Sequence, residues 1–346
     1  MVKGINFMQR AIELAQLGTG HVSPNPLVGC IIVHDNKIIG EGWHQQFGQA
    51  HAEVNAVNSV KQKDLLTDAE MYVTLEPCGH FGKTPPCTDL IIKSGIRKVI
   101  VASKDPNPIV NGQGIQKLRE AGIEVITGML EAEAEDMNRR FITYFTSKRP
   151  YLILKWAETA DGFIAREDYT SKWISNDSSR QLVHKWRSEE DAILVGTTTA
   201  LKDNPTLTVR DWPGRNPLRI VIDKQQSVPE SSNIFNQESK TICYNVLNSK
   251  KIGENNWVSL SAETFMNDMI TDLYHRKVQS VIVEGGRHTL QSFIDAGLWD
   301  ELRVFKAPVK FGNGILAPKF SASPFESFQL GSDVLEIHRN IMPSGH

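Results

Sequence analysis

The feature that most constrains this chain is a group of metal-binding residue types in two short stretches. His51 and Glu53 are separated by one residue, Cys78 follows Pro77, and Cys87 comes soon after. One imidazole and two thiolates suit a zinc ion that keeps its fourth coordination position for a water, whose pKa the metal lowers. A carboxylate that is not a ligand can then move the proton of that water. We therefore expect His51, Cys78 and Cys87 to be zinc ligands and Glu53 to be the proton shuttle.

The local sequence around these residues is compatible with such a site. A helix is expected to begin near His51, and the strand expected at 71–75 must end at Pro77. Cys87 opens another helical pattern, where the helix dipole favours a thiolate. His-x-Glu followed by Pro-Cys and a second Cys is typical of zinc-dependent nucleobase deaminases, although their simple signature has two residues between the cysteines. This chain has eight. The alternative is that these are ordinary buried residues, but all four together favour the metal site.

Composition narrows the class of protein. The 346 residues suggest two domains at roughly 150 residues each, and 40% hydrophobic with 23% charged residues is an ordinary globular composition. A net charge of −2 offers no electrostatic case for nucleic-acid binding. We find no apolar run of membrane-spanning length and no signal peptide at the N-terminus. Four cysteines do not make a disulfide framework and fit a reducing cytoplasm. Cys30 and Cys243 are expected in the core.

Strand and helix patterns alternate along the whole chain, which predicts an α/β layer architecture. A break at 146–150 separates a domain at 1–146 from a domain at 150–346. The expected strands are 28–33, 38–44, 71–75, 99–102, 123–127, 151–155, 192–195, 218–222, 241–244, 280–284 and finally 301–305. The main expected helices are 7–17, 49–57, 88–92, 114–121, 131–145, 177–187, 262–274 and 289–296.

The second half carries weaker signals. The strand at 280–284 runs into Gly285 and Gly286 and then a helix, an arrangement in which backbone N–H groups can approach a phosphate. A plain turn is the alternative. Three further clusters, at 159–162, 171–175 and 203–210, follow predicted elements, where binding residues tend to collect. The spacing of these clusters does not by itself indicate which reaction the second half catalyses.

Several longer motifs in both halves of the sequence resemble those of a known family. The first half contains Pro24-Asn25-Pro26-x-Val28-Gly29-Cys30, His51-Ala52-Glu53-Val54, and Leu-Glu-Pro-Cys-Gly-His-x-Gly-Lys-Thr-Pro-Pro-Cys at 75–87. The second half contains Leu154-Lys155, Asp161-Gly162, Ser171-x-Trp173-Ile174, Asp203-Asn204-Pro205-x-Leu207-Thr208 and Val283-Glu284-Gly285-Gly286. These stretches closely resemble the bifunctional riboflavin-biosynthesis deaminase–reductase family, which also has eight residues between the two cysteines.

The resemblance implies a cytidine-deaminase-like α/β/α domain followed by a dihydrofolate-reductase-like α/β domain. The first would deaminate 2,5-diamino-6-ribosylamino-4(3H)-pyrimidinone 5′-phosphate with a zinc-bound hydroxide. The second would reduce the ribosyl group with NADPH, giving 5-amino-6-(5-phospho-ribitylamino)uracil. The implied cofactors are one Zn²⁺ per chain and NADPH. The choice of NADPH over NADH comes from the resemblance alone.

Site residues follow from the same resemblance, position by position. The deaminase substrate positions are Asn25, His44, His80 and Lys83, of which Lys83 suits a phosphate. The NADPH positions are Ala157, Trp173, Thr199, Asp203, Gly285, Gly286, Arg287, His288, Thr289 and Leu290. The reductase substrate positions are Ser171, Arg187, Leu207, Arg210 and Glu284, and the two arginines suit the ribotide phosphate. The sequence identifies no general acid for the reduction.

Three alternatives stay open at this stage. One is a tRNA or free-nucleoside deaminase fused to an unrelated domain. Another is a structural zinc site, closed by His80 as a fourth ligand. In the third, the second half has lost its catalytic activity. The expected partner is a small pyrimidine ribotide, and we expect binding to neither nucleic acid nor a membrane. We further expect the protein to be cytoplasmic and to form a homo-oligomer.

Overall fold

The chain folds into two compact α/β units, Met1–Lys148 and Arg149–His346. The computed structural model describes residues 2–79, 85–108, 110–169 and 174–340. His80, Lys83, Ser171 and Trp173 lie outside these ranges. None of the helices within these ranges is both long enough and apolar enough to cross a membrane. The alternation of strands and helices confirms the predicted fold class.

A mixed sheet forms the centre of the first unit. Among the described residues it has five strands in the order β2-β1-β3-β4-β5, with β1 antiparallel to both neighbours and β3, β4 and β5 parallel. The strands are β1 Gly29–His34, β2 Lys37–Trp43, β3 Glu70–Leu75, β4 Lys98–Ser103 and β5 Glu124–Thr127. Residues of β1 alternate between two buried faces, with Cys30 and Ile32 on one and Ile31 and Val33 on the other. This explains the continuous apolar run seen in the sequence.

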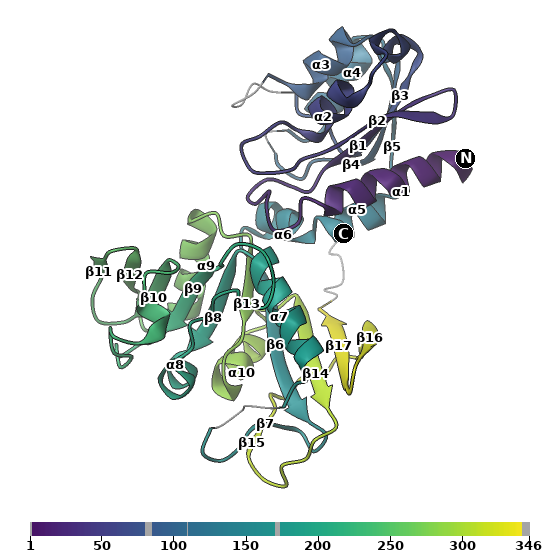
Figure 1. The fold of residues 1–346 in the computed structure, drawn as a ribbon. Helices are drawn as coiled ribbons and strands as arrows, with labels where there is room; N and C mark the ends of the chain where they lie inside the picture. Colours follow the sequence, from purple (N-terminus) through teal and green to yellow (C-terminus); the bar gives the residue numbers. More distant parts are fainter. Residues whose placement is uncertain (1, 80–84, 109, 170–173, 341–346) are drawn as a thin grey trace. The chain divides into compact units, whose positions relative to one another are not determined.

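Helices cover both faces of this sheet (Figure 1). Its helices are α1 Val2–Gln16, α2 Ala52–Ser59, α3 Cys87–Lys93, α4 Gln113–Glu120, α5 Glu131–Met137 and α6 Arg139–Ser147, with a 3₁₀ turn at Lys63–Asp68. Helices α2, α3 and α4 pack on one face, and α1 and α5 on the other. Helix α2 lies so close to β2 that a Cβ at Gly42 would come within 2.2 Å of the Ala56 nitrogen. Glycine at this position therefore sets the place of the helix that follows His51.

The expected single helix at 131–145 is wrong, because the structure breaks it at Asn138. The Asn138 side chain is buried, and its Nδ2 donates to the Leu27 carbonyl at 2.9 Å. Its Oδ1 accepts from the Leu27 N–H at 2.8 Å. This pair of bonds ties the junction between α5 and α6 to the segment that carries Asn25.

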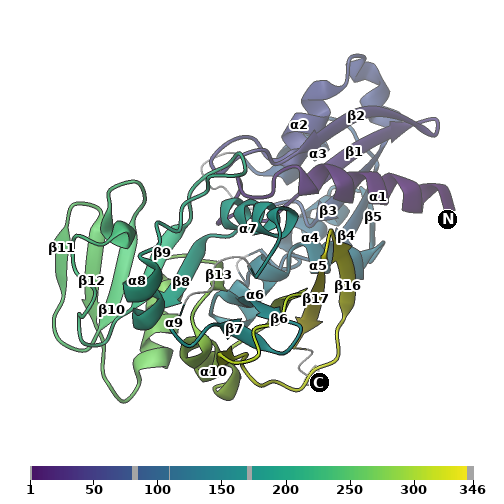
Figure 2. The ribbon, with the colours of Figure 1, turned by 60° about the horizontal axis from the view of Figure 1, so that its bottom comes forward.

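A larger sheet forms the centre of the second unit, with ten strands among the described residues. Their order is β11-β12-β10-β9-β8-β13-β6-β14-β17-β16, parallel from β12 to β14 and antiparallel at both edges. Figure 2 shows β11 and β16 at the two edges. The strands are β6 Tyr151–Thr159, β8 Ala192–Gly196, β9 Leu218–Ile222, β10 Thr241–Asn245, β11 Lys250–Ile252, β12 Asn255–Ser259, β13 Ser280–Val283, β14 Glu301–Ala307, β16 Glu326–Leu330 and β17 Asp333–Arg339. A separate small pair joins β7 Phe163–Ala165 to β15 Ile315–Leu316.

Helices also cover both faces of the larger sheet. They are α7 Asp177–Glu189, α8 Thr197–Asp203, α9 Phe265–His275 and α10 Arg287–Asp295, with a 3₁₀ turn at Asn233–Phe235. Helices α9 and α10 pack on one face, and α7 and α8 on the other. Cys243 is buried against the second face, and Cys30 is buried in the first unit, as the sequence predicted.

The expectation that 301–305 forms the last strand is wrong, since β15, β16 and β17 follow it. Strand β16 is an edge strand with four exposed residues, so it lacks the alternation that marks a half-buried strand. In β17 two of the buried positions are the polar residues Asp333 and His338. Their burial depends on hydrogen bonds across the fold, which local hydropathy does not reveal.

Replacing Asn138 by Leu tests the tie between the α5–α6 junction and Leu27. A side chain of similar size without polar atoms leaves the Leu27 N–H and C=O unpaired in a partly buried place, which costs about 1–3 kcal/mol. We expect the free energy of unfolding of the first unit to fall by that amount in chemical denaturation. The matched control is Asn58→Leu, at an exposed position of α2. Equal stability of the two variants would show that the Leu27 bonds contribute nothing.

Candidate functional site

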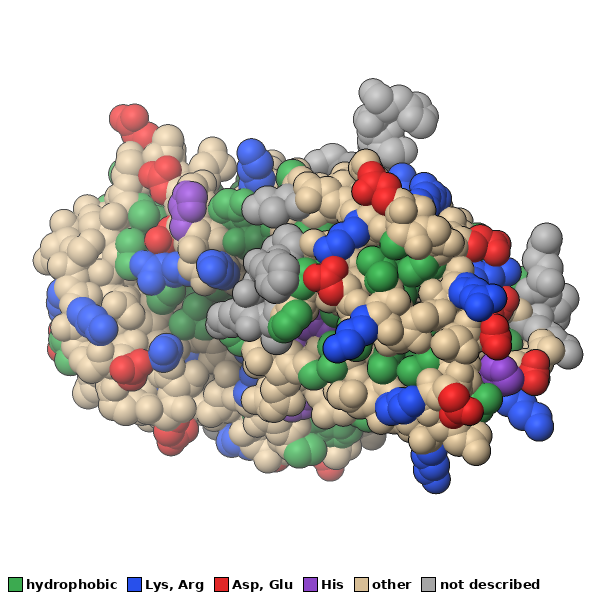
Figure 3. All heavy atoms as spheres, turned by 90° about the horizontal axis from the view of Figure 1, so that it is seen from above, with side chains coloured by type: hydrophobic (Ala, Val, Ile, Leu, Met, Phe, Trp, Pro, Cys, Tyr) green, Lys and Arg blue, Asp and Glu red, His purple; other side chains and the backbone are tan. Residues whose placement is uncertain are grey.

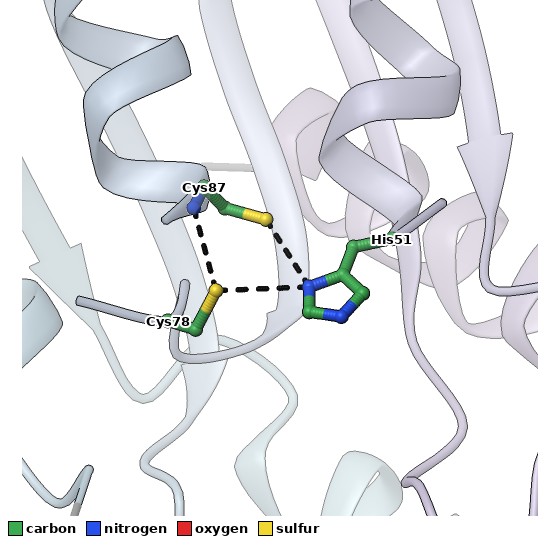
Figure 4. Close-up of side chains that lie close together, drawn as sticks. All are labelled: His51, Cys78 and Cys87. Carbon is green, nitrogen blue, oxygen red and sulfur yellow. Dashed lines mark hydrogen bonds between the residues drawn. The ribbon is translucent and has the colours of Figure 1, made fainter. Parts of the chain in front are cut away.

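The three predicted metal ligands converge from three separate elements. His51 precedes α2 as its N-cap residue, Cys78 lies in the loop after β3, and Cys87 is the first residue of α3. Figure 4 shows both sulfurs directed at one ring nitrogen of His51: Nδ1 is 3.6 Å from the Sγ of Cys78 and 3.3 Å from the Sγ of Cys87. The three ligand atoms lie within 4.8 Å of one another. A tetrahedral zinc ion with ordinary bond lengths separates sulfur and nitrogen ligands by about 3.6 Å, so the donor set fits zinc.

The two cysteines share one hydrogen-bond network. The hydrogen bond from the Cys87 thiol lowers the pKa of Cys78 to about 4, and His51 acts in the same direction. The Cys87 backbone N–H also donates to the Cys78 sulfur at 3.3 Å. The pKa of Cys87 is raised because its thiol donates to Cys78 and is buried. A divalent cation between them favours the thiolate form of both residues.

Glu53 lies within the first turn of α2, two residues after His51. Its side chain is buried, and burial raises the pKa of its carboxyl to about 7, with the neighbouring Cys78 adding to the increase. The positive charge of a bound zinc ion acts in the opposite direction. A carboxyl group in such a place can take up and release a proton near neutral pH, as a proton shuttle must.

Two of the predicted substrate residues lie beside the metal ligands. The Asn25 Nδ2 and His44 Nε2 atoms are 3.0 Å apart, and the rings of His44 and His51 meet edge-on with centroids 5.6 Å apart. His44 Nδ1 is 3.1 Å from the Ala50 carbonyl oxygen, so this nitrogen carries the proton and Nε2 accepts from Asn25. Burial lowers the pKa of His44, which favours this neutral form.

In the second unit, the predicted cofactor residues gather at the carboxyl ends of parallel strands. Thr199 is in α8, which follows β8, and Gly286 is the N-cap residue of α10, which follows β13. The Gly286 N–H donates to the Thr199 Oγ1 at 3.0 Å. In open α/β sheets ligands bind at this end of the strands. Asp203 is the last residue of α8, Ala157 lies in β6, and Arg287, His288, Thr289 and Leu290 form the start of α10.

Not all of these side chains face outward. Thr289 packs against the backbone of two glycines: a Cβ at Gly285 would lie 2.6 Å from the Thr289 Cβ, and one at Gly196 would lie 2.2 Å from its Oγ1. Leu290 is fully buried in the hydrophobic core. Both residues therefore fix the turn between β13 and α10, and the backbone of 285–288 is left to approach a ligand.

A buried charged cluster lies at the same end of the sheet. Arg187 of α7 pairs with Glu284 at 2.7 Å, and both side chains are about nine-tenths buried. Burial acts to raise the pKa of Glu284, but Arg187 and Lys155 together outweigh it and lower that pKa to about 2. Lys155 is partly buried, and desolvation lowers its pKa. Lys155 was not among the residues assigned a role from the sequence; the available signal was a lysine within an apolar strand.

Leu207 and Arg210 lie in the loop after α8, and Asp161 lies in the turn after β6. The Arg210 N–H donates to the His184 Nδ1 at 3.3 Å. Burial lowers the pKa of His184, and the nearby positive charge of Arg187 lowers it further. Leu207 is buried in a hydrophobic cluster. The Asp161 carboxylate accepts from the N–H groups of Phe311 and Gly312, so it anchors a loop.

Comparison with known proteins gives a family match for each half of the chain. The family model described as "Cytidine and deoxycytidylate deaminase zinc-binding region" matches residues 1–103, and the one described as "RibD C-terminal domain" matches 150–333. The riboflavin biosynthesis protein RibD of Aquifex aeolicus is 43% identical over 316 residues, covering 90% of this chain and 88% of that protein. RibD of Bacillus amyloliquefaciens is 40% identical over 338 residues, covering 95% and 90%.

Solved structures extend the similarity to the whole fold. A diaminohydroxyphosphoribosylaminopyrimidine deaminase/5-amino-6-(5-phosphoribosylamino)uracil reductase from Thermotoga maritima has a TM-score of 0.90 and 40% identity, covering 98% of this chain and 99% of its own. RibD of Acinetobacter baumannii has a TM-score of 0.89 and 32% identity with the same coverage. This chain belongs to the RibD family, and as a bifunctional enzyme of riboflavin biosynthesis it carries both a zinc-binding deaminase domain and a reductase domain.

Proposed function

We propose that the chain deaminates 2,5-diamino-6-ribosylamino-4(3H)-pyrimidinone 5′-phosphate in its first domain and reduces the ribosyl group of the product with NADPH in its second. The observation that carries the first step is the convergence of two sulfurs on one nitrogen of His51, with the buried Glu53 on the same helix. Hydrolysis at zinc and reduction by a nicotinamide are the two classes of chemistry that the family combines.

For the deamination, we assign His51, Cys78 and Cys87 as the residues that hold zinc. When bound, the metal supplies a Lewis acid that activates water for attack on the ring carbon bearing the amino group. Glu53 carries a proton from the attacking water to the ring nitrogen and then to the departing ammonia. The hydrogen-bonded pair of Asn25 and His44 would orient the pyrimidine ring, which is supported by its position beside His51.

For the ribotide, we assign phosphate and sugar contacts from the family positions. His80 and Lys83 complete the deaminase substrate site. Arg187, Arg210, Ser171, Leu207 and Glu284 belong to the reductase substrate site. Leu207 is buried, so its part would be to shape the loop that carries Arg210.

We propose that NADPH binds at the turn between β13 and α10. Glycine at 285 lets the Thr289 side chain pack against this turn. Helix α10 begins here, where backbone N–H groups and the helix dipole favour a phosphate of NADPH. Thr199 supports Gly286, while Asp203, Ala157, Trp173, Arg287, His288, Thr289 and Leu290 are the other proposed cofactor positions. NADPH when bound supplies the hydride, and the protein holds the two reactants together.

We further propose that the enzyme acts in the cytoplasm on small molecules and forms a homo-oligomer. The free cysteines fit a reducing compartment. On the face shown in Figure 3, Lys and Arg side chains are interspersed with Asp and Glu, which differs from the basic surface expected of a nucleic-acid partner. The edge strand β16 exposes Phe328 and leaves a sheet edge that a second copy can cover.

One reaction tests the two-step proposal. The purified zinc-loaded chain is mixed with the diaminopyrimidinone ribotide and NADPH, and ammonia and NADPH oxidation are followed together. We expect ammonia first and NADPH oxidation after it. Ammonia without NADPH oxidation would contradict the reductase assignment. Absence of both, with zinc present in the protein, would contradict the substrate assignment.

Glu53→Gln tests the proton shuttle. An amide cannot take the proton from water, so we expect ammonia release to fall by at least about 100-fold. Zinc content should stay at the wild-type level because no ligand atom changes. Reduction of the already deaminated intermediate, with NADPH supplied, should also be unchanged. The matched control is Glu133→Gln, at an exposed position. Ammonia release at the wild-type rate would exclude Glu53 from this role.

The buried pair of Glu284 and Arg187 predicts an acid-sensitive second domain. Because the pKa of Glu284 falls from the ordinary 4.5 to about 2 on folding, its ionised form stabilises the folded state above pH 4.5. This contribution, at most about 3 kcal/mol, is lost as the pH falls from 4.5 toward 2. Six of the seven tryptophans lie after residue 149, so tryptophan fluorescence reports the unfolding of this domain.

Glu284→Gln removes the titrating group in that experiment. We expect its free energy of unfolding to be lower than that of the wild type at pH 7, because Arg187 and Lys155 lose their counterion. The difference between the two proteins should shrink as the pH falls from 5 to 3. A constant difference over this range would contradict the lowered pKa.

A further inference from the structure

Glu76 is a buried acidic residue that the site described above does not use. It follows β3 and stands two residues before Cys78, and its side chain is 4% exposed. Both carboxylate oxygens accept backbone hydrogen bonds. Oε1 accepts from Gly114 at 2.9 Å and Ile115 at 3.2 Å, while Oε2 accepts from Gly112 at 2.9 Å and, more weakly, from Asp105 at 3.4 Å.

These contacts satisfy the start of helix α4. The first N–H groups of a helix have no partner within it, and Gly112 is the N-cap residue of α4. A negatively charged side chain in this position is also favoured by the helix dipole. Three of the four N–H groups therefore belong to the α4 N-terminus, although Glu76 is separated from it by 36 to 39 positions in the sequence.

A second contact holds the same loop against α4. A Cβ at Gly114 would lie 1.9 Å from the Pro77 carbonyl oxygen, and one at Gly79 would lie 3.3 Å from the Gly114 Cα. The loop backbone on either side of Cys78 thus rests directly on the first turn of α4. Only a residue without a side chain at position 114 permits this approach.

The position of Cys78 depends on this loop. Its carbonyl accepts from the Thr88 N–H at 3.2 Å, and its sulfur accepts from the Cys87 N–H at 3.3 Å. A shift of 76–79 away from α4 would change the distances from the Cys78 sulfur to His51 and Cys87. Metal sites require ligand distances within about 0.2 Å of their ideal values, so a small shift is enough to weaken binding.

We propose that Glu76 is a positioning residue of the metal centre, which holds the Cys78 loop in register with the other two ligands by binding the start of α4. The proposal rests on the zinc deaminase function proposed above. It assigns Glu76 no contact with substrate or metal. Its carboxylate is suited to the task because both oxygens accept hydrogen bonds, whereas an amide presents two donors in place of one of those oxygens.

Glu76→Gln is the sharpest test, because it keeps the size of the side chain. The side-chain amide nitrogen of the glutamine replaces one carboxylate oxygen and cannot accept a hydrogen bond. Two of the four backbone N–H groups therefore lose their acceptor. We expect zinc affinity, measured by competition with a chelator, to fall by about 10- to 100-fold, the range seen for outer partners of metal ligands. The ligand-field spectrum of the cobalt-substituted protein should change, because the geometry of the sulfur ligands changes.

Two controls separate positioning from general damage. Glu120→Gln, an exposed residue at the other end of α4, should keep wild-type zinc affinity and cobalt spectrum. NADPH-dependent reduction of the deaminated intermediate should be unchanged in both variants, since it takes place in the second domain. Wild-type zinc affinity and an unchanged cobalt spectrum in Glu76→Gln would overturn the proposal.

A measurement on the unmodified protein keeps the proposal testable if the variant does not fold. Amide hydrogen exchange at Gly114 and Ile115 is compared between the zinc-loaded and chelator-treated enzyme. We expect faster exchange at these amides after zinc removal, because Glu76 links them to the Cys78 loop, and no change in α1. Equal exchange in the two forms would overturn the proposal. A lack of ammonia release by the wild type would instead contradict the deaminase function and leave the zinc measurements valid.

Discussion

The deaminase domain depends on one geometric constraint: two sulfurs and one imidazole nitrogen must meet within a few ångströms. Of the three proposed ligands, His51 and Cys87 stand at the starts of α2 and α3, and Cys78 lies in the loop that follows the end of β3. The parallel pairing of β3 with β4 and the packing of α2, α3 and α4 on one face of the sheet bring these ends together. No further element is needed to position Glu53, because the first turn of α2 places it next to His51.

The reductase domain depends on a different interaction, the burial of a carboxylate between two cations. Glu284 directly follows the strand β13. This strand lies between β6 and β8, which carry Lys155 and the segment leading to Thr199. Arg187 reaches the same place from α7. Burial acts to raise the pKa of Glu284, but the two neighbouring cations outweigh it and keep the carboxylate ionised. The charged cluster and the glycine turn, which we propose bind the ribotide and the cofactor, therefore lie at one end of the sheet.

Both domains keep their functional loops in place through buried side chains that bind backbone. Glu76 accepts N–H groups at the start of α4, Asn138 pairs with Leu27, and Asp161 accepts from the loop at 311–312. None of these three residues was given a structural part from the sequence. Asn138 was expected inside a helix, and its polar side chain is what interrupts that helix. An isolated polar residue in a sequence carries no sign of the distant backbone group it will bind.

The amino-acid sequence by itself determined the α/β class and the two-part organisation of motifs, and it contained the residues that we propose hold the metal. It could do so because these signals are local: strands and helices follow hydrophobic periodicity, and Pro-Cys, His-x-Glu and Gly-Gly occupy a few adjacent positions. The tertiary structure alone decided which distant groups meet. The bonds from Glu76 to α4 and from Asn138 to Leu27 join residues 36 to 39 and 111 positions apart. The charge of Lys155 lowers the pKa of Glu284 only because β6 and β13 are neighbours in the sheet. Such contacts follow from the packing of whole elements, which no short stretch of sequence contains.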